Sequence, residues 1–240
     1  MDFRGLVKFT LVDYPGKIGC IVFSGGCNLR CPFCHNPCLV FDPASQPRVT
    51  EKEFFRFLER RKGLLEGVVF SGGEPLLHPD APDVVAKVRE MGYAAKIDTN
   101  GTLPERVEAL LEKSGADAFG IDCKAPAGRY AALTGSSDPE VAKKVYASIR
   151  LAQESGAELD IRTTVHRALL DEEALETMFD EIRAAGVTMW TLQQYNPVEV
   201  IDDELSKKET YTDAELVRIA RRFGPGVRVR GLTGRIVDHA

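Results

Sequence analysis

Four cysteines crowd into twelve residues near the start of this chain, and they are the residues best suited to chemistry. They are Cys27, Cys31, Cys34 and Cys38, in GGCNLRCPFCHNPC. Six cysteines spaced this unevenly over 240 residues do not make a disulfide framework. Because thiolates bind soft metals, the cluster predicts a metal site.

Three of these thiolates, in Cys27-x3-Cys31-x2-Cys34, can each take one iron of a four-iron cube. The fourth iron would then stay open to chelate a ligand and pass it an electron. A zinc knuckle, or a four-thiolate cluster closed by Cys38, is the alternative that the cysteines alone leave open.

Polar and glycine-rich segments follow several short apolar runs farther along the chain. They are Ser71-Gly72-Gly73-Glu74-Pro75, Asp98-Thr99-Asn100-Gly101, Asp122-Cys123-Lys124, Arg162 in IRTTV and Asn196 in LQQYNP. Taken singly, they can be helix-leading turns, a local ion pair or a buried arginine with a core acid. Together they are expected to converge, because the carboxyl ends of parallel strands share one mouth.

Short β-branched runs alternate with helical patterns along the chain. A short strand over 6–14 and a Pro-Gly turn come first, and six core strands are expected at 18–23, 67–70, 94–98, 118–122, 158–164 and 188–195. Capping boxes, Thr50 with Glu53 and Thr212 with Glu215, begin the first and last helices. The helices between them are expected at 82–91, 104–114, 139–155 and 171–185, and VRVRG is a candidate for a last strand.

This order predicts an α/β fold, an incomplete open (β/α)6 barrel of parallel strands, that is, a partial TIM barrel. A complete eight-stranded barrel takes about 250 residues. The N-terminal extension and the C-terminal tail leave too few residues here for eight βα units. We expect a single domain over 1–240, with an N-terminal extension over 1–17, six βα units over 18–196 and a C-terminal tail over 197–240. A doubly wound sheet is the alternative, but cysteines stand where its phosphate fingerprint would be.

Composition narrows the possible partners. Lys plus Arg number 31 against 36 for Asp plus Glu, a net charge of −5, which argues against a broad nucleic-acid surface. No stretch approaches the roughly 20 apolar residues of a membrane span, and MDFRGLVKFT has no leader-like apolar region. A cytoplasmic protein is therefore expected.

The cysteine loop, with Phe33 before its last cysteine, resembles the signature of the radical S-adenosylmethionine (SAM) superfamily. The resemblance implies one [4Fe–4S] cluster on Cys27, Cys31 and Cys34, with SAM on the open iron. It also implies that the segment Gly72-Gly73-Glu74 meets the amino group of SAM.

Within that superfamily, CPFCHNP, the segment Asp98 to Gly101 and the segment Asp122 to Lys124 resemble the activating enzymes of glycyl-radical enzymes. This resemblance implies that Asp98, Thr99 and Asp122 meet the SAM ribose or a monovalent cation. Lys124 would meet the SAM carboxylate.

Three further candidates have weaker support. Arg162 and Asn196 end the fifth and sixth strands and could contact adenosine or carboxylate, although the pyruvate formate-lyase activator has a histidine near the Asn196 position. His35 could contact adenine or a cluster sulfur, or simply stabilise a turn. The isolated Cys20 and Cys123 are expected to be structural, since strand alternation turns Cys123 away from its neighbours.

The implied activity is reductive cleavage of SAM to a 5′-deoxyadenosyl radical, which then takes hydrogen from a glycine of a partner enzyme. VKFTLVDYPGKI with CPFCHNP most resembles activating proteins of the anaerobic (class III) ribonucleoside-triphosphate reductase. Flavodoxin or ferredoxin would supply the electron. The alternatives are a small-molecule radical SAM enzyme, such as one that makes a deazapurine from a pterin, and a non-enzymatic four-cysteine iron–sulfur or zinc protein.

Overall fold

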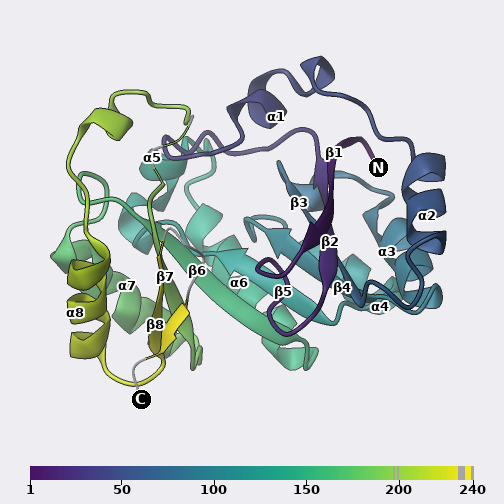
Figure 1. Cartoon of the computed structure of the whole chain (residues 1–240). Coiled ribbons are helices and arrows are strands. Elements are labelled where there is room, and N and C mark those ends of the chain that lie inside the picture. The colour runs from purple at the N-terminus through teal and green to yellow at the C-terminus, as the bar shows by residue number, and fades with distance from the viewer. Residues whose placement is uncertain (197, 199, 232–235, 239–240) are drawn as a thin grey trace.

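A single curved sheet runs through the computed structural model, which describes residues 1–196, 198, 200–231 and 236–238. Its strands follow the order of the chain, β1 to β9 (Figure 1). The parallel strands are β2 Gly19–Ser24, β3 Gly67–Gly72, β4 Ala94–Thr99, β5 Ala118–Asp122, β6 Glu158–Val165, β7 Trp190–Gln194 and β8 Val227–Arg230. The edge strands β1 Phe3–Thr10 and β9 Ile236–Asp238 are antiparallel to their neighbours. The sheet is open, because its two edges do not pair in the described residues.

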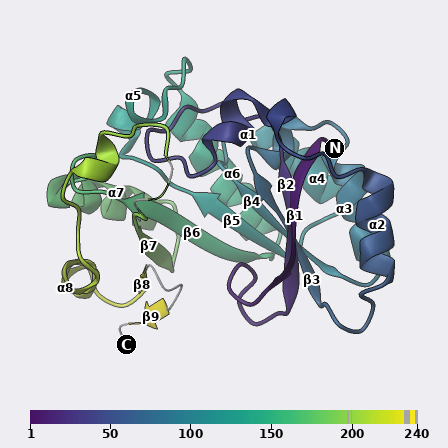
Figure 2. The same ribbon diagram turned by 45° about the horizontal axis from the view of Figure 1, so that its top comes forward.

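Long helices lie along the outside of the curved sheet, as Figures 1 and 2 show. They are α2 Glu51–Glu59, α3 Ala81–Glu90, α4 Pro104–Lys113, α6 Val141–Glu154, α7 Glu172–Ala184 and α8 Asp213–Phe223. The shorter helices are α1 Pro37–Phe41 and α5 Tyr130–Thr134, with single 3-10 turns at Pro43–Ser45, Pro75–Leu77, Ala127–Arg129 and Leu205–Lys207. This alternation confirms the predicted partial barrel.

Local sequence signals explain where the helices begin. Both predicted capping boxes are present: Thr50 caps α2 with Glu53, and Thr212 caps α8 with Glu215. In each box the threonine hydroxyl accepts from the N3 amide and the glutamate accepts from the cap amide, so orphan donors of the first turn are satisfied. The caps thereby fix the start of each helix against its strand.

The core lies between the helices and the outer face of the sheet. Strand residues alternate, so Phe119 and Ile121 of β5 are fully buried against helices, whereas Gly120 and Asp122 face the inside of the barrel. Cys20 and Cys123 are buried in the outer core and lie outside the inner cavity, as predicted. Because alternate strand residues face opposite sides of the sheet, polar side chains can gather on its inner face, inside the barrel.

Two parts of the fold differ in extent from the predicted elements. The first strand spans Phe3–Thr10, and residues 11–17 form bends and a turn instead of continuing it. The candidate strand in VRVRG exists as β8, which adds a parallel strand beyond the six predicted ones. The predicted tail, 197–240, is described only in part, and it contains α8, β8 and β9. Among the described residues, no helix is both long and apolar enough to cross a bilayer.

Candidate active site

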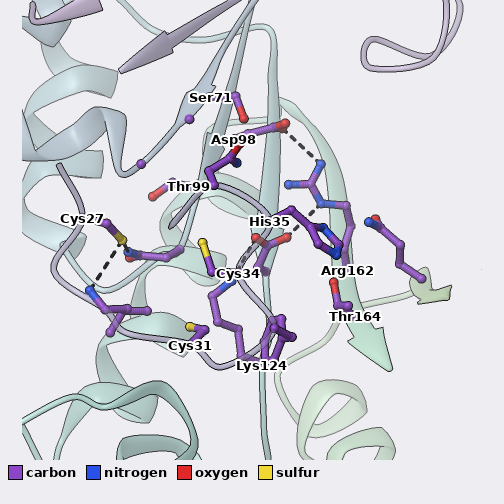
Figure 3. A pocket seen from close by; sticks show the side chains of 18 of the residues that line it. Cys27, Cys31, Cys34, His35, Ser71, Asp98, Thr99, Lys124, Arg162 and Thr164 are labelled. Atoms are coloured by element: carbon purple, nitrogen blue, oxygen red, sulfur yellow. Dashed lines mark hydrogen bonds and ion pairs between the residues drawn. The ribbon is translucent and has the colours of Figure 1, made fainter. Parts of the chain in front are cut away.

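A cavity of about 330 Å³ opens at the carboxyl ends of the strands, and its volume is within the range typical of small-molecule sites. It brings together twelve of the fourteen predicted site residues: Cys27, Cys31, Phe33, Cys34, His35, Gly72, Gly73, Asp98, Thr99, Asp122, Lys124 and Arg162. Figure 3 shows the thiols on one side of this cavity and Arg162 on the other. Glu74 and Asn196 do not line it.

The cysteine loop follows β2 directly and crosses the top of the sheet before α1 (Figure 1). The sulfur atoms of Cys27, Cys31 and Cys34 surround one space in Figure 3. Burial raises the pKa of Cys31 to about 12, against the opposing charge of Lys124. Metal ligation must therefore displace the thiol protons, as it does wherever cysteine is a ligand.

Three thiols of the cysteine loop line one cavity, and the fourth does not. Within the described residues, no three His, Cys, Asp or Glu side chains are placed to hold one metal ion. A cubane with one open iron needs three thiolates, one for each of the other irons. Cys38 lies on α1, outside the cavity lining. The donor set therefore fits a three-thiolate iron–sulfur cluster.

Asn100 holds the first cysteine of the loop, a contact that sequence reasoning did not identify. Its amide nitrogen donates to Cys27 Sγ at 3.8 Å and to Asn28 Oδ1 at 2.8 Å. Asn28 in turn donates to the Thr102 hydroxyl at 2.7 Å. Because hydrogen bonds to cluster sulfurs tune the reduction potential, Asn100 is a candidate for that role. The DTNG segment contained the signal, but its asparagine also suits an ordinary turn.

The glycine pair after β3 packs against the backbone of the cysteine loop. The Gly73 amide donates to the Ser24 carbonyl at 2.8 Å. A β-carbon on Gly73 would lie 1.9 Å from the Gly26 carbonyl oxygen, one residue before Cys27. Gly72 has φ +108°, and a β-carbon there would lie 2.6 Å from the Ser24 amide nitrogen. Only glycine can occupy both positions without moving the loop.

Glu74 is fully buried and faces away from the cavity, so the prediction that it meets the amino group of SAM is not supported by its position. Its carboxylate accepts from the amides of Leu76 and Asn100 at 3.0 and 2.7 Å. The Thr99 hydroxyl also donates to it, at 2.8 Å. Burial raises the pKa of Glu74 to about 7, against these three donors. Glu74 therefore links the glycine segment to the end of β4.

Arg162 joins the carboxylates of two strands across the floor of the cavity. Its guanidinium lies 3.3 Å from Asp98 and 3.0 Å from Asp122, and Lys124 lies 3.0 Å from the other Asp122 oxygen. Burial alone would raise the pKa of Asp122, but Lys124 and Arg162 hold it well below its usual range. Gly120 leaves the room for this pairing, because a β-carbon there would lie 2.3 Å from Asp98 Oδ1. The residues of these ion pairs, Asp98, Asp122, Lys124 and Arg162, all line the cavity.

The aromatic residues of the cysteine loop also face the cavity. Phe33 is 6% exposed, and the Lys124 ammonium lies 5.8 Å from its ring centroid. His35 pairs through Nε2 with the Asn196 carbonyl at 3.0 Å, and burial lowers its pKa. The Asn196 side chain is exposed, so this residue meets the site through its backbone. Its predicted contact with SAM through the side chain is not supported by this placement.

A second, smaller core covers the cysteine loop from the C-terminal side. Leu29 and Phe33 pack there with Tyr195 and Leu205. The Asp202 amide donates to the Pro32 carbonyl at 2.9 Å. This cover excludes water from one flank of the thiols, and its residues beyond 196 were predicted only as a tail.

The comparisons with known proteins agree with this site. Residues 21–182 match the model of the radical SAM superfamily. The chain therefore belongs to the radical SAM superfamily, whose members use a [4Fe–4S] cluster held by three cysteines together with SAM.

Within the superfamily, the chain is similar to two proteins described as activating enzymes, to one of them over nearly its whole length. It is 31% identical to "Putative glycyl-radical enzyme activating enzyme MJ1227" of Methanocaldococcus jannaschii, over 96% of both chains. Over 45% of this chain and 47% of the relative, it is 42% identical to the pyruvate formate-lyase-activating enzyme of Clostridium pasteurianum.

Solved structures share the fold at low sequence identity. Streptococcus suis SuiB superposes with a TM-score of 0.64 at 19% identity, covering 88% of this chain and 48% of SuiB. Native anSMEcpe with bound AdoMet gives a TM-score of 0.60 at 17% identity, covering 83% of this chain and 57% of that one. The chain thus spans about half the length of these structures.

Proposed function

We propose that this chain activates a glycyl-radical enzyme, and that the partner is an anaerobic ribonucleoside-triphosphate reductase. The observation that carries the proposal is the convergence of three thiols and the Arg162 ion-pair wall on one cavity. The full-length similarity to an enzyme described as a glycyl-radical activator supports the class of reaction.

In this role Cys27, Cys31 and Cys34 hold a [4Fe–4S] cluster, which supplies the single electron that splits SAM into methionine and a 5′-deoxyadenosyl radical. Lys124 stands beside the thiols and provides the positive charge for the methionine carboxylate. Asp98 and Asp122 accept hydrogen bonds from the ribose hydroxyls. Arg162 holds both carboxylates in place between neighbouring strands.

A monovalent cation at Asp98 and Asp122 stays a prediction. Both carboxylates already have cationic partners in the chain: Lys96 lies 2.5 Å from Asp98, and Lys124 lies 3.0 Å from Asp122. A bound cation would therefore add positive charge beside two carboxylates whose negative charge these lysines already balance.

The exposed border of the cavity beside the turn between β1 and β2 suits a macromolecular substrate. Val12 and Asp13 line the cavity from the turn between β1 and β2, at the end away from the cysteine loop, because Thr10 pairs with Gly19 at the start of β2. Val12 is 57% exposed, and Phe9 and Leu11 beside it are similarly exposed. Exposed apolar side chains grouped at a site indicate a surface that another molecule covers. A docked partner would also complete the exclusion of water and oxygen from the radical.

The assignment of ribonucleotide reductase as the partner rests on the same segment, the end of β1 and the turn that follows it. The stretch VKFTLVDYPGKI carries the resemblance to activators of that enzyme, and it forms the end of β1 and the exposed turn beside the cavity. An exposed segment that also lines the cavity is where partner selectivity would act. The role places the chain in the cytoplasm, with flavodoxin or ferredoxin as electron donor.

Isotope transfer tests the proposal. The reductase is prepared with α-deuterated glycine and incubated without oxygen with the reduced, cluster-loaded chain and SAM. We expect deuterium in 5′-deoxyadenosine by mass spectrometry. Unlabelled 5′-deoxyadenosine formed at full rate would show that the hydrogen comes from another substrate, as in the small-molecule class.

A further inference from the structure

A strongly basic groove lies between β1 and α2, on the face of the sheet opposite the cavity. We propose that this groove docks the acidic face of a one-electron carrier protein that reduces the cluster. The inference rests on the proposed function, because it requires a cluster to reduce. It adds a location and a mode of recognition for the electron donor.

The groove has a volume of about 870 Å³ and is lined by six cationic side chains against one carboxylate, a charge of +5 in a chain of net charge −5. The cations are Arg4, Lys8, Arg48, Arg56, Arg60 and Arg61. Arg4 pairs with Asp2. The other five form no ion pair within the part of the chain that the structure describes. The single carboxylate, Glu53, is engaged by the amide and hydroxyl of Thr50 in the cap of α2.

This concentration of unpaired charge requires a reason. Like charges along one groove repel. The helix dipole favours Arg56, Arg60 and Arg61 at the C-terminal end of α2, but it does not account for Lys8 and Arg48 beside them. Leu6, Val49 and Phe57 form an apolar floor between the cations. An apolar centre with an arginine-rich rim is the composition of a protein interface rather than that of a solvated surface.

The register of β1 on β2 separates the groove from the substrate side. Leu6 pairs with Val22, which is buried in the outer core, so Leu6 and its alternate neighbours Arg4 and Lys8 face outward toward α2. Val7 pairs with Ile21 and faces the opposite side. A protein in the groove and a partner at the cavity can therefore bind at the same time.

Arg4, one of the residues that line the groove, lies next to the segment before the cysteines. A β-carbon on Gly25 would lie 3.1 Å from Arg4 Cγ, and Gly25 precedes Cys27 by two residues. The Gly25 amide donates to the Asp2 carbonyl at 2.9 Å. Arg4 thus links the groove to the segment that leads into the cysteine loop. The cluster held by the thiols would take one electron from the carrier across this segment, and the carrier would be oxidised by one electron with no bond made or broken.

Charge complementarity selects the occupant. A basic groove on an acidic protein steers an acidic partner into one orientation and weakens as salt screens the charges. The donor must bind briefly and leave after one electron, which suits an electrostatic contact with a small apolar centre. A docked glycyl-radical enzyme is the competing occupant, and the experiment separates the two.

The test compares a charge-reversed pair, Arg56→Glu with Arg60→Glu, with the matched control Arg106→Glu with Arg150→Glu. The control residues are exposed on α4 and α6, away from the groove. Stopped-flow absorbance follows reduction of the cluster by an acidic flavodoxin hydroquinone, and dithionite serves as a small-molecule reductant. We expect reduction by flavodoxin to be at least ~10-fold slower in the groove variant only. Added salt should also slow reduction of the wild type, because charge reversal and salt both weaken the electrostatic attraction of the donor to the groove.

Reduction by dithionite and the SAM cleavage that follows should be unchanged in both variants. Equal flavodoxin rates in the wild type and the groove variant would overturn the inference. A groove variant that accepts electrons normally but no longer activates the reductase under dithionite would assign the groove to that partner instead. Absence of dithionite-driven SAM cleavage in the wild type would count against the proposed function itself.

Discussion

Gly73 lies so close to Gly26 that no β-carbon fits between them: an alanine methyl at 73 would lie 1.9 Å from the Gly26 carbonyl oxygen. The two glycines belong to different loops, one after β3 and one before Cys27. The Glu74 amide strengthens the contact by donating to the same carbonyl at 2.8 Å. The segment assigned to SAM and the loop assigned to the cluster are therefore one packed unit.

Replacing Gly73 should damage the cluster as well as SAM binding. In Gly73→Ala the methyl must push the Gly26 backbone away, which moves Cys27 and costs about 1–3 kcal/mol of overpacking. Iron per chain after anaerobic reconstitution should fall well below the about four expected for one cubane. Gly128→Ala is the control, since its β-carbon meets nothing within 4 Å. Full iron content in Gly73→Ala would show that the loops move independently.

Cys38→Ala should keep about four irons per chain and still cleave SAM, because a cubane with one open iron needs three thiolates. Cys38 lies on α1, outside the cavity, whereas Cys31 and Cys34 line it. Cys34→Ala, measured in parallel, should lose the cluster. If Cys38→Ala lost both iron and cleavage, the site would be a closed four-thiolate one.

Gly120→Ala should weaken SAM binding while the cluster assembles normally. Its methyl would lie 2.3 Å from Asp98 Oδ1 and 2.9 Å from Arg162 Nη1, so the ion pair must open. Loss of the carboxylate position should raise the SAM dissociation constant by ~10-fold, about 1.4 kcal/mol. Equilibrium binding to the reconstituted protein measures this. An unchanged affinity would mean that Asp98 does not contact the ligand.

Asp160→Asn should lower stability at neutral pH, because Asp160 connects β6 with β8. It lies 3.0 Å from Arg228 and from Arg230. Burial alone would raise the pKa of Asp160, but Arg162, Arg230 and Arg228 lower it to about 2.

A carboxyl whose pKa is lower in the folded state stabilises the fold above its unfolded pKa and loses that contribution as pH falls. The shift from 3.8 to about 2 corresponds to about 2 kcal/mol. Urea unfolding of the cluster-free chain should therefore separate wild type from Asp160→Asn at pH 7, and the gap should narrow below pH ~4, toward the pKa of about 2. A gap independent of pH would mean that lost packing, and not charge, causes it.

Alternation and capping made much of the fold predictable from sequence. Thr50 with Glu53 and Thr212 with Glu215 are complete local signals, so both helix starts were placed correctly. The carboxyl ends of parallel strands lie at the same end of the barrel, so the residues that follow them could be expected to meet. Asp98 and Asp122 line the cavity for that reason.

Contacts between distant segments were not predictable from local patterns. Glu74 follows two glycines and could equally have faced a ligand, and only the packing of β3 beside β4 turns its carboxylate toward Thr99. The cover formed by Leu205 over Phe33 depends on the path of a long connection, which has no sequence period. The basic groove could not be predicted from the sequence, because its cations come from three separate segments, β1, a loop and α2. The net charge of the whole chain does not reveal such a local excess.

The glycyl radical itself tests the central claim most directly. Reduced, cluster-loaded chain, SAM and an anaerobic ribonucleotide reductase are mixed without oxygen and frozen for electron paramagnetic resonance. The account predicts a glycyl doublet that needs all three components and disappears when the acceptor glycine of the reductase is changed to alanine. SAM cleaved at full rate, with no glycyl signal on this or any other glycyl-radical enzyme but with turnover of a small heterocycle, would contradict it.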